Sequence, residues 1–140
     1  MKVTFWVFCV VSIANGLWML VAPYSWYMDL PASVPDTGPF NPHFVRDLGV
    51  TFVVLGAGFG WSANNLHRCY PVVLGLTAWF VGHAGLHVAD IFSGRLPHAH
   101  WGIDLPAVFL PAMLLLTLSL PPVWRTVMQR NGMAGHNLGK

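Results

Sequence analysis

Residues 71–92 read PVVLGLTAWFVGHAGLHVADIF and decide the fold of this chain. The stretch is apolar apart from a few side chains, chiefly His83, His87 and Asp90. Its length is close to the ~20 residues that cross ~30 Å of hydrocarbon as an α-helix. In lipid, backbone N–H and C=O groups must bond within their own segment, so a helix is the expected conformation. The stretch therefore predicts a membrane-spanning helix over about 71–92.

The rest of the chain repeats this pattern. The protein has 140 residues, of which 55% are hydrophobic and only 9% are charged. A soluble domain carries about 25% charged residues, so too few are present here to cover a globule with polar surface. Three more apolar stretches lie at about 3–22, 45–63 and 103–120. We expect an all-α polytopic membrane protein: one transmembrane domain over 1–140, built as a four-helix bundle, with the lipid bilayer as its solvent.

The charges predict an orientation. Positive residues favour the cytoplasmic side of a membrane. With both termini inside, five basic residues lie inside (Lys2, Arg68, Arg125, Arg130 and Lys140), and Arg46 and Arg95 lie outside. All five acidic residues are then outside: Asp29, Asp36, Asp47, Asp90 and Asp104. We expect a bacterial inner-membrane protein with both termini in the cytoplasm, its first span being an uncleaved signal anchor.

The connecting segments differ in length. The predicted outer loop, about 23–44, is long and rich in proline and aromatic residues. Because aromatic side chains favour the headgroup level, we expect this loop to lie along the membrane interface. Asn41 and Pro42 should cap and begin the second span. The tail 121–140 should be an interfacial segment followed by a disordered end. Cys9 and Cys69 should be reduced thiols rather than a disulfide.

His83, His87 and Asp90 provide the sharpest functional pattern. Their spacing is i, i+4, i+7, which places three polar side chains on one face of a helix. The neighbouring spans begin with similar sets, one of His43, Arg46 and Asp47 and one of His100 and Asp104. Ionisable groups within a membrane normally face the bundle interior and mark a functional site. We expect the three sets to converge near the outer surface.

Histidine and aspartate together predict a transition-metal site. Imidazole and carboxylate are good ligands for copper and zinc, and histidines at i, i+4 can bind one ion from one helical face. The predicted ligands are His83, His87, Asp90 and His100. The groups expected in a second shell, or as alternative ligands, are His43, Arg46, Asp47 and Asp104. Haem is a minor option, because His83 has no evident histidine partner at equal depth.

Other interpretations stay open. Arg46 could neutralise Asp47, Asp90 or Asp104 in a structural network of hydrogen-bonded histidines. A quinone or another small ligand could occupy a slot lined by Trp79, Trp101 and Phe44. The chain could also be an accessory or structural subunit of a larger membrane complex, without chemistry of its own.

Small residues on two of the predicted spans indicate where helices can pack closely, either within the chain or between copies of it. Gly56 and Gly60 form a GxxxG spacing, and Gly75, Gly82 and Gly85 belong to a small-residue stripe on the third span, so both helices can be approached closely. We expect packing within the chain, with a homo-oligomer contact as the alternative. Basic residues are few and do not suggest nucleic-acid binding. Whether the protein is an enzyme is left open, because no nucleophile setting or phosphate-binding loop is evident.

Two stretches carry a resemblance. Residues 38–49, GPFNPHFVRDLG, and residues 14–20, ANGLWML, followed by Pro23, resemble segments of small uncharacterised bacterial four-span membrane proteins. The overall layout is similar to that of DoxX-like proteins in size and number of spans, which implies a fold but no activity. The spacing His83-x3-His87-x12-His100 resembles the Asp-x3-His-x12-His copper motif in the C subunit of membrane copper monooxygenases, with His83 in the place of the aspartate. This second resemblance implies copper as the ion.

Overall fold

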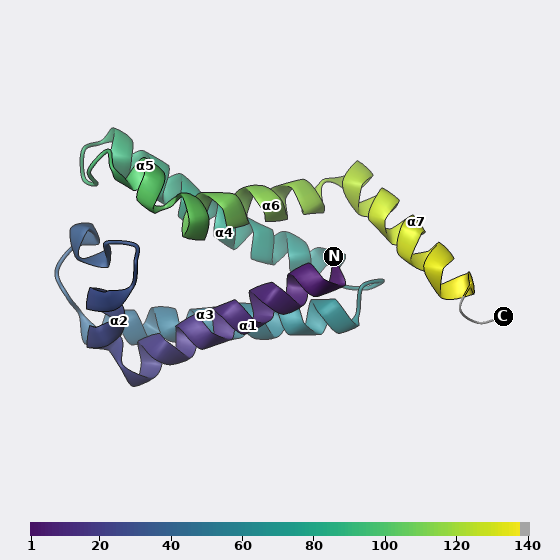
Figure 1. Cartoon of the computed structure of the whole chain (residues 1–140), viewed down its shortest axis with the longest axis horizontal. Coiled ribbons are helices and arrows are strands. Elements are labelled where there is room, and N and C mark those ends of the chain that lie inside the picture. Colours follow the sequence, from purple (N-terminus) through teal and green to yellow (C-terminus); the bar gives the residue numbers. More distant parts are fainter. Residues whose placement is uncertain (138–140) are drawn as a thin grey trace.

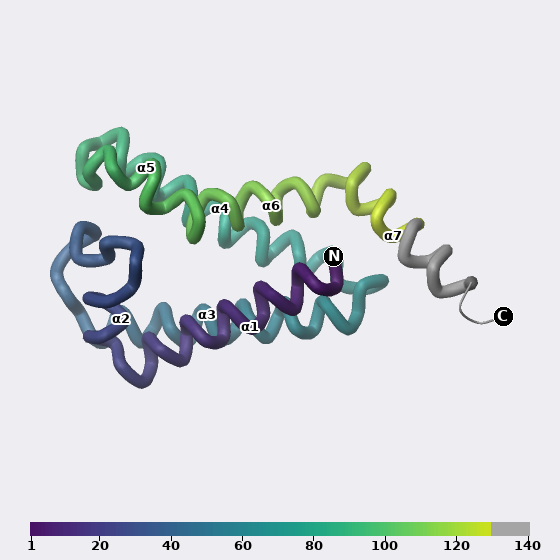
Figure 2. The backbone as a smooth tube through the Cα atoms, in the orientation of Figure 1, coloured from purple at the N-terminus to yellow at the C-terminus, as the bar shows by residue number. Residues whose placement is uncertain are grey.

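The computed structural model describes the backbone of residues 1–137 and the side chains of residues 1–129, and the described chain is helical throughout its long segments (Figures 1 and 2). The long helices are α1 (Lys2–Val21), α3 (Pro42–Asn64), α4 (Tyr70–Phe92), α6 (Leu110–Ser119) and α7 (Pro121–Asn137). Shorter elements are α2 (Pro23–Asp29), the 3-10 turn η1 (Val34–Thr37), α5 (His100–Ile103) and the π-turn η2 (Leu105–Phe109). The helical fold predicted from the sequence is confirmed.

Three helices, α1, α3 and α4, are long and apolar enough to cross a membrane. A fourth span arises only if 105–119 and 121–129 count together, and these two segments meet at 71°. The bend has a local cause. Leu120 is extended because the α conformation is disfavoured before a proline, and two prolines follow it. Three helices are therefore long and apolar enough to span a membrane, or four if the bent pair forms one span.

Figure 1 shows two layers, with α1 beside α3 and α4 beside α5 and α6. The α1–α3 seam is close because glycine occupies it on both sides. A Cβ added to Gly16 would lie 2.6 Å from the carbonyl oxygen of Gly49, and one added to Gly56 would lie 2.6 Å from Ile13 Cγ1. The packing within the chain predicted for Gly56 and Gly60 is confirmed, since a Cβ on Gly60 would lie 3.0 Å from Cys9 Sγ.

The small-residue stripe of α4 behaves differently. Added Cβ atoms on Gly75, Gly82 and Gly85 would meet nothing within 4 Å. The prediction that this stripe packs within the chain is therefore wrong. The main core lies instead on the opposite side of α4, where Phe80 meets Phe59 and Phe8 with ring centroids 5.9 and 5.6 Å apart.

The segment 23–44, which the sequence predicts as a long outer loop along the interface, contains two short helical elements, α2 and η1. Trp26 Nε1 donates a 2.8 Å hydrogen bond to Asn15 Oδ1, which fastens α2 to α1. The predicted cap is confirmed: Asn41 Oδ1 accepts hydrogen bonds from the backbone N–H groups of His43 and Phe44, both at 3.1 Å. The helices position α2 and η1 at one end of the bundle.

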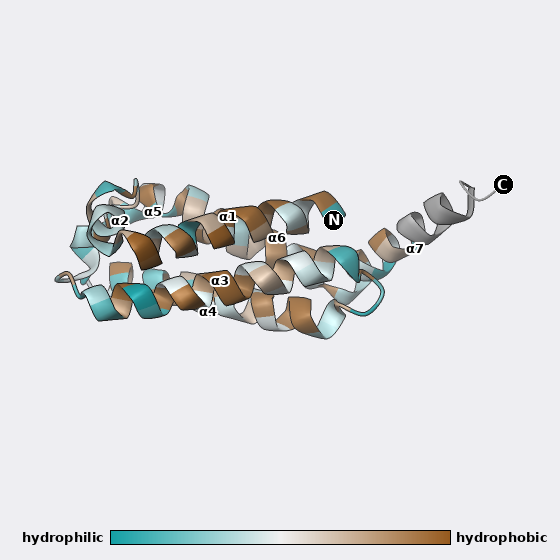
Figure 3. Ribbon diagram, turned by 90° about the horizontal axis from the view of Figure 1, so that it is seen from below, coloured by the Kyte–Doolittle hydropathy of each residue, from teal (hydrophilic) through white to brown (hydrophobic). Residues whose placement is uncertain are grey.

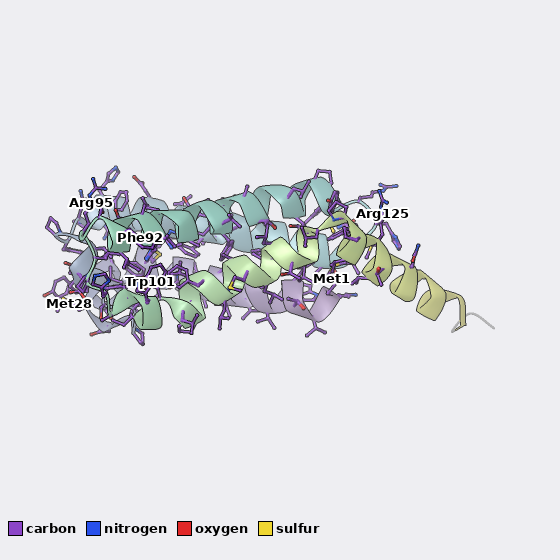
Figure 4. All side chains as sticks on the ribbon, turned by 90° about the horizontal axis from the view of Figure 1, so that it is seen from above. Met1, Met28, Phe92, Arg95, Trp101 and Arg125 are labelled. Carbon is purple, nitrogen blue, oxygen red and sulfur yellow. The ribbon has the colours of Figure 1, made fainter. Side chains whose placement is uncertain are left out.

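Polar residues gather at the two ends of the long helices (Figure 3). We call the end formed by α2, η1, α5, the beginning of α3 and the end of α4 the aspartate end. Figure 4 shows Met28, Phe92, Arg95 and Trp101 there, with Met1 and Arg125 toward the opposite end. The predicted tail is helical as far as Asn137, and residues 138–140 of the expected disordered end lie outside the described residues, as do the side chains of Arg130, His136 and Lys140. Both cysteines are free.

Candidate functional site

Asp104 is the centre of the polar network at the aspartate end. It lies between α5 and η2, where the helix widens: the N–H groups of Val108 and Phe109 both donate to its carbonyl oxygen, at 2.8 and 3.1 Å. Pro106 and Pro111 cannot donate, so the regular pattern of hydrogen bonds is interrupted around this turn. Such π-turns occur frequently at functional sites. Here the wide turn begins at a buried carboxylate.

Two histidines from different helices contact the Asp104 carboxylate. His87 Nδ1 on α4 lies 2.8 Å from Asp104 Oδ2. His100 Nδ1 on α5 lies 3.1 Å from Oδ2 and 3.2 Å from Oδ1. The other ring nitrogen of His100, Nε2, lies 3.2 Å from Asp36 Oδ2 on η1. These contacts form one chain, which we call the His/Asp chain: Asp36, His100, Asp104 and His87.

Burial changes sharply along the His/Asp chain. The side chains of His100 and Asp104 are 0% and 1% exposed, whereas that of Asp36 is 45% exposed. A buried charge is tolerated only when it is paired and hydrogen-bonded, and Asp104 has both kinds of support. The His/Asp chain thus links the half-exposed carboxylate of Asp36 to the buried carboxylate of Asp104.

Hydrogen-bonding capacity fixes the roles of the imidazoles. An ionised carboxylate only accepts, so each nitrogen that contacts one must carry a proton. His100 faces carboxylate oxygens on both sides, so with both acids ionised it is an imidazolium. His87 donates from Nδ1 to Asp104, which leaves its Nε2 able to accept a proton or a hydrogen bond when the ring is neutral.

His83 lies one helical turn from His87 and has different surroundings. Its ring stacks on Trp79, with centroids 5.2 Å apart and planes inclined by 18°, and it meets the His87 ring edge-on at 4.6 Å. It is nine residues from the end of α4, or about 14 Å along the helix. Within residues 1–129, neither ring nitrogen of His83 has a hydrogen-bond partner.

A shallow groove of about 370 Å³ between α3 and α4 includes His83. The groove is lined by four apolar side chains, by Gly82 and by His83. The apolar side chains are those of Leu48, Ala78, Trp79 and Leu86. Gly82 contributes only backbone, which keeps this part of the groove open. His83 is therefore the one imidazole exposed to an otherwise apolar groove at mid-helix.

The predicted ligand set is divided among three environments. His87 and His100 share Asp104, whereas Asp90 accepts a 3.2 Å hydrogen bond from Arg95 Nη1. The sequence placed His83, His87 and Asp90 on one stripe, and the stripe meets a different partner at each residue. The turn after α4 brings Arg95 to Asp90, and no contact joins Asp90 to the histidines among the described side chains, so their predicted convergence stays a prediction.

The group at the beginning of α3 also lies apart from the His/Asp chain. His43 Nε2 and Asp47 Oδ2 are 3.4 Å apart, and both side chains are largely exposed. Arg46 is exposed as well. The structural network predicted around Arg46 is replaced by one around His100, because Asp104 takes histidine partners and Asp90 takes Arg95.

The donor set does not fit a three-ligand metal centre. Among the described side chains, no group of three or more His, Cys, Asp or Glu residues is arranged to hold a metal ion. His100 has both nitrogens engaged with carboxylates, which leaves His83 and His87 as a pair. The predicted copper or zinc site stays a prediction that this arrangement does not support.

Of the residues predicted to line a slot, only Trp79 borders the groove. Trp101 packs on Phe92 and Phe109, with ring centroids 5.5 and 5.7 Å away, and Phe44 is exposed. The structure adds Asp36, which sequence reasoning missed as a site residue. Asp36 and His100 are 64 positions apart, and nothing local to the segment around Pro35 indicates their contact.

Comparison with known proteins gives no match: no family model fits the sequence, and no curated protein or solved structure is significantly similar to it.

Proposed function

We propose that this chain is a membrane protein that binds a lipid-soluble small molecule carrying a ring and a hydrogen-bonding group. The ligand occupies the groove between α3 and α4, and His83 is its polar contact. The observation that carries this proposal is the unpaired His83 imidazole, stacked on Trp79 and lining an apolar groove. An ionisable group at this depth is expensive and by default functional.

The chemistry of the groove selects the ligand class. Aromatic rings favour offset-stacked or edge-on neighbours, and the stacked rings of Trp79 and His83 both line the groove, where a third ring could contact them. A phenolic hydroxyl or a ring carbonyl could then hydrogen-bond to His83, which accepts at one nitrogen and donates from the other. The apolar lining suits a ligand that enters from the bilayer. Quinone-type rings belong to this class.

The proposal includes the membrane arrangement expected from the sequence. In it, α5, η2 and α6 form a fourth span antiparallel to α4, and α7 turns away along the cytoplasmic interface. The aspartate end then faces outward, and His83 lies near the bilayer centre. This orientation rests on the distribution of basic residues.

Binding is tested with an octyl-chain nitrophenol titrated into the full-length protein in lipid nanodiscs. Saturable binding above the partition into empty nanodiscs is expected. His83→Phe keeps a ring that can stack on Trp79 but removes both nitrogens, so it should weaken binding at least tenfold, the order of one lost hydrogen bond. His43→Phe changes an exposed histidine and is the matched control.

A second pair of variants tests the groove itself. Gly82 and Gly75 are both open positions on α4, but only Gly82 lines the groove. Gly82→Leu should fill the groove and abolish binding, whereas Gly75→Leu should leave it unchanged. Equal binding by the two variants, or an affinity that His83→Phe leaves unchanged, would refute the proposed site.

A further inference from the structure

We infer that the His/Asp chain is a proton route between the groove and the aqueous surface at the aspartate end, and that the groove ligand is therefore one that exchanges a proton while bound. The inference rests on the proposed function and adds to it a ligand subclass, weakly acidic hydroxylated rings. It also assigns a role to Asp36, His100, Asp104 and His87, none of which has to touch the ligand.

The continuity of the His/Asp chain is the first argument. Three successive contacts of 2.8 to 3.2 Å join His87 to Asp104, Asp104 to His100 and His100 to Asp36. Each contact pairs an imidazole with a carboxylate, so each link has one group that can give up a proton and one that can take it. A network built only for rigidity needs no member at the surface, yet this one ends at half-exposed Asp36.

The direction of proton transfer follows from the imidazole nitrogens of His83 and His87 that have no hydrogen-bond partner among the described residues. The proton leaves the hydroxyl of the bound ring and is taken up by an imidazole at the groove, so the ring becomes an anion and the imidazole a cation. His83 and His87 touch edge-on, and a proton passes between them after rotation of a ring or through one water. His87 then delivers its Nδ1 proton to Asp104, which becomes a neutral acid, while the His100 imidazolium releases its Nε2 proton through Asp36 to water and becomes neutral. Rotation of the neutral His100 ring then lets it accept the Asp104 proton, which restores the starting state. One proton enters and one leaves, without an oxidant.

The surrounding charges isolate this route. The groups that face Asp104 are His87 from α4 and His100 from α5, and η1 contributes Asp36 through His100. Asp90 is paired with Arg95, and Asp47 with His43, so neither competes for these histidines. Among the described ion pairs, no Lys or Arg contacts Asp36 or Asp104, and their partners in these pairs are histidines.

The test is a rapid pH jump on the full-length protein in nanodiscs with the octyl-chain nitrophenol bound, because the ionised probe absorbs visible light. The bound probe should change colour quickly in the wild type and at least tenfold more slowly in Asp104→Asn. Asp36→Asn should slow it similarly, and because Asp36 is half exposed this variant reports on the route even if Asp104→Asn folds poorly. Neither variant should change the affinity for the probe, and Asp47→Asn, at an exposed carboxylate outside the route, should change neither quantity.

The two proposals fail differently. Unaltered rates in Asp36→Asn and in folded Asp104→Asn, with the probe still bound through His83, would overturn the proton route and leave the ligand site standing. A probe that never binds saturably would overturn both.

Discussion

His87 Nδ1 lies 2.8 Å from Asp104 Oδ2, and this contact joins α4 to the wide turn that precedes α6. The same carboxylate also accepts from His100, so one buried acid orients two imidazoles from two helices. A carboxylate that accepts from one ring nitrogen of a histidine fixes the tautomer and leaves the other nitrogen free to accept. The polar network therefore both fastens the helices and prepares His87 for proton exchange.

His100→Ala is expected to destabilise the protein strongly. His100 is fully buried and contacts two carboxylates, so its removal leaves Asp104 with fewer partners in an apolar interior. The free energy of unfolding should fall by about 3–5 kcal/mol. Denaturant titration in detergent, followed by circular dichroism, measures this. His98→Ala, at an exposed position two residues away, should stay within about 0.5 kcal/mol, and an equal effect of both variants would contradict the network.

Gly16→Ala is expected to open the α1–α3 seam. The new methyl group would lie 2.6 Å from the Gly49 carbonyl oxygen, which is backbone and cannot move without the helix. A loss of about 1–3 kcal/mol in the free energy of unfolding should follow. Gly75→Ala, where the added Cβ meets nothing, is the matched control and should cause no loss. Similar stability of the two variants would mean that α1 and α3 are not in backbone contact.

Cys69 is expected to react slowly with thiol reagents. Burial raises the pKa of its thiol above the ordinary 9.0, and Sγ donates to the carbonyl oxygen of Leu66 at 3.4 Å. The thiolate is the nucleophile, so iodoacetamide at pH 8 should modify Cys69 much more slowly in folded than in unfolded protein. Mass spectrometry of the peptide containing Cys69 measures the rate, and Cys69→Ser supplies the blank.

The same shift has a consequence for stability. Because the pKa of Cys69 is raised in the fold, the folded state favours the neutral thiol. Its contribution to stability is therefore complete below pH 9.0 and is lost as the pH rises through the raised value. Cys69→Ser should flatten the fall in stability above pH 9. An unchanged alkaline profile would show that the thiol does not govern this limb.

Metal analysis separates the ligand proposal from the site predicted from the sequence. His83 and His87 remain as a pair without a third described ligand, so protein expressed with excess copper and zinc should carry less than one ion per chain. Elemental analysis of the wild type against His87→Ala measures this. One tightly held ion per chain in the wild type, absent from His87→Ala, would restore the metal site and displace the ring ligand.

The spans α1, α3 and α4 could be predicted within a few residues, because bilayer thickness dictates length and an apolar run shows it directly. The fourth segment was less predictable. Pro106 and Pro111 divide this segment into α5, η2 and α6, and Pro121 and Pro122 turn α7 away from the axis of α6. The angles between these pieces depend on packing against neighbouring helices, which hydropathy does not describe.

The candidate site was predictable in part. The helical period correctly places His83 and His87 on one side of α4. It cannot reveal that Arg95 reaches Asp90 across a tight turn, or that Asp36 approaches His100 over 64 positions. Both contacts depend on where connecting segments fold back. Short-range periodicity carries no record of that.

The close backbone contact at Gly16 and Gly49 joins α1 and α3 into one pair of helices, while α4 and α6 form a second pair. The boundary between the two pairs includes the groove that His83 lines. At the aspartate end, the contact between Asp36 on η1 and His100 on α5 crosses that boundary. Among the described ion pairs, this contact is the only one that crosses the boundary, so Asp36→Asn would remove the single ionic link between the two helix pairs.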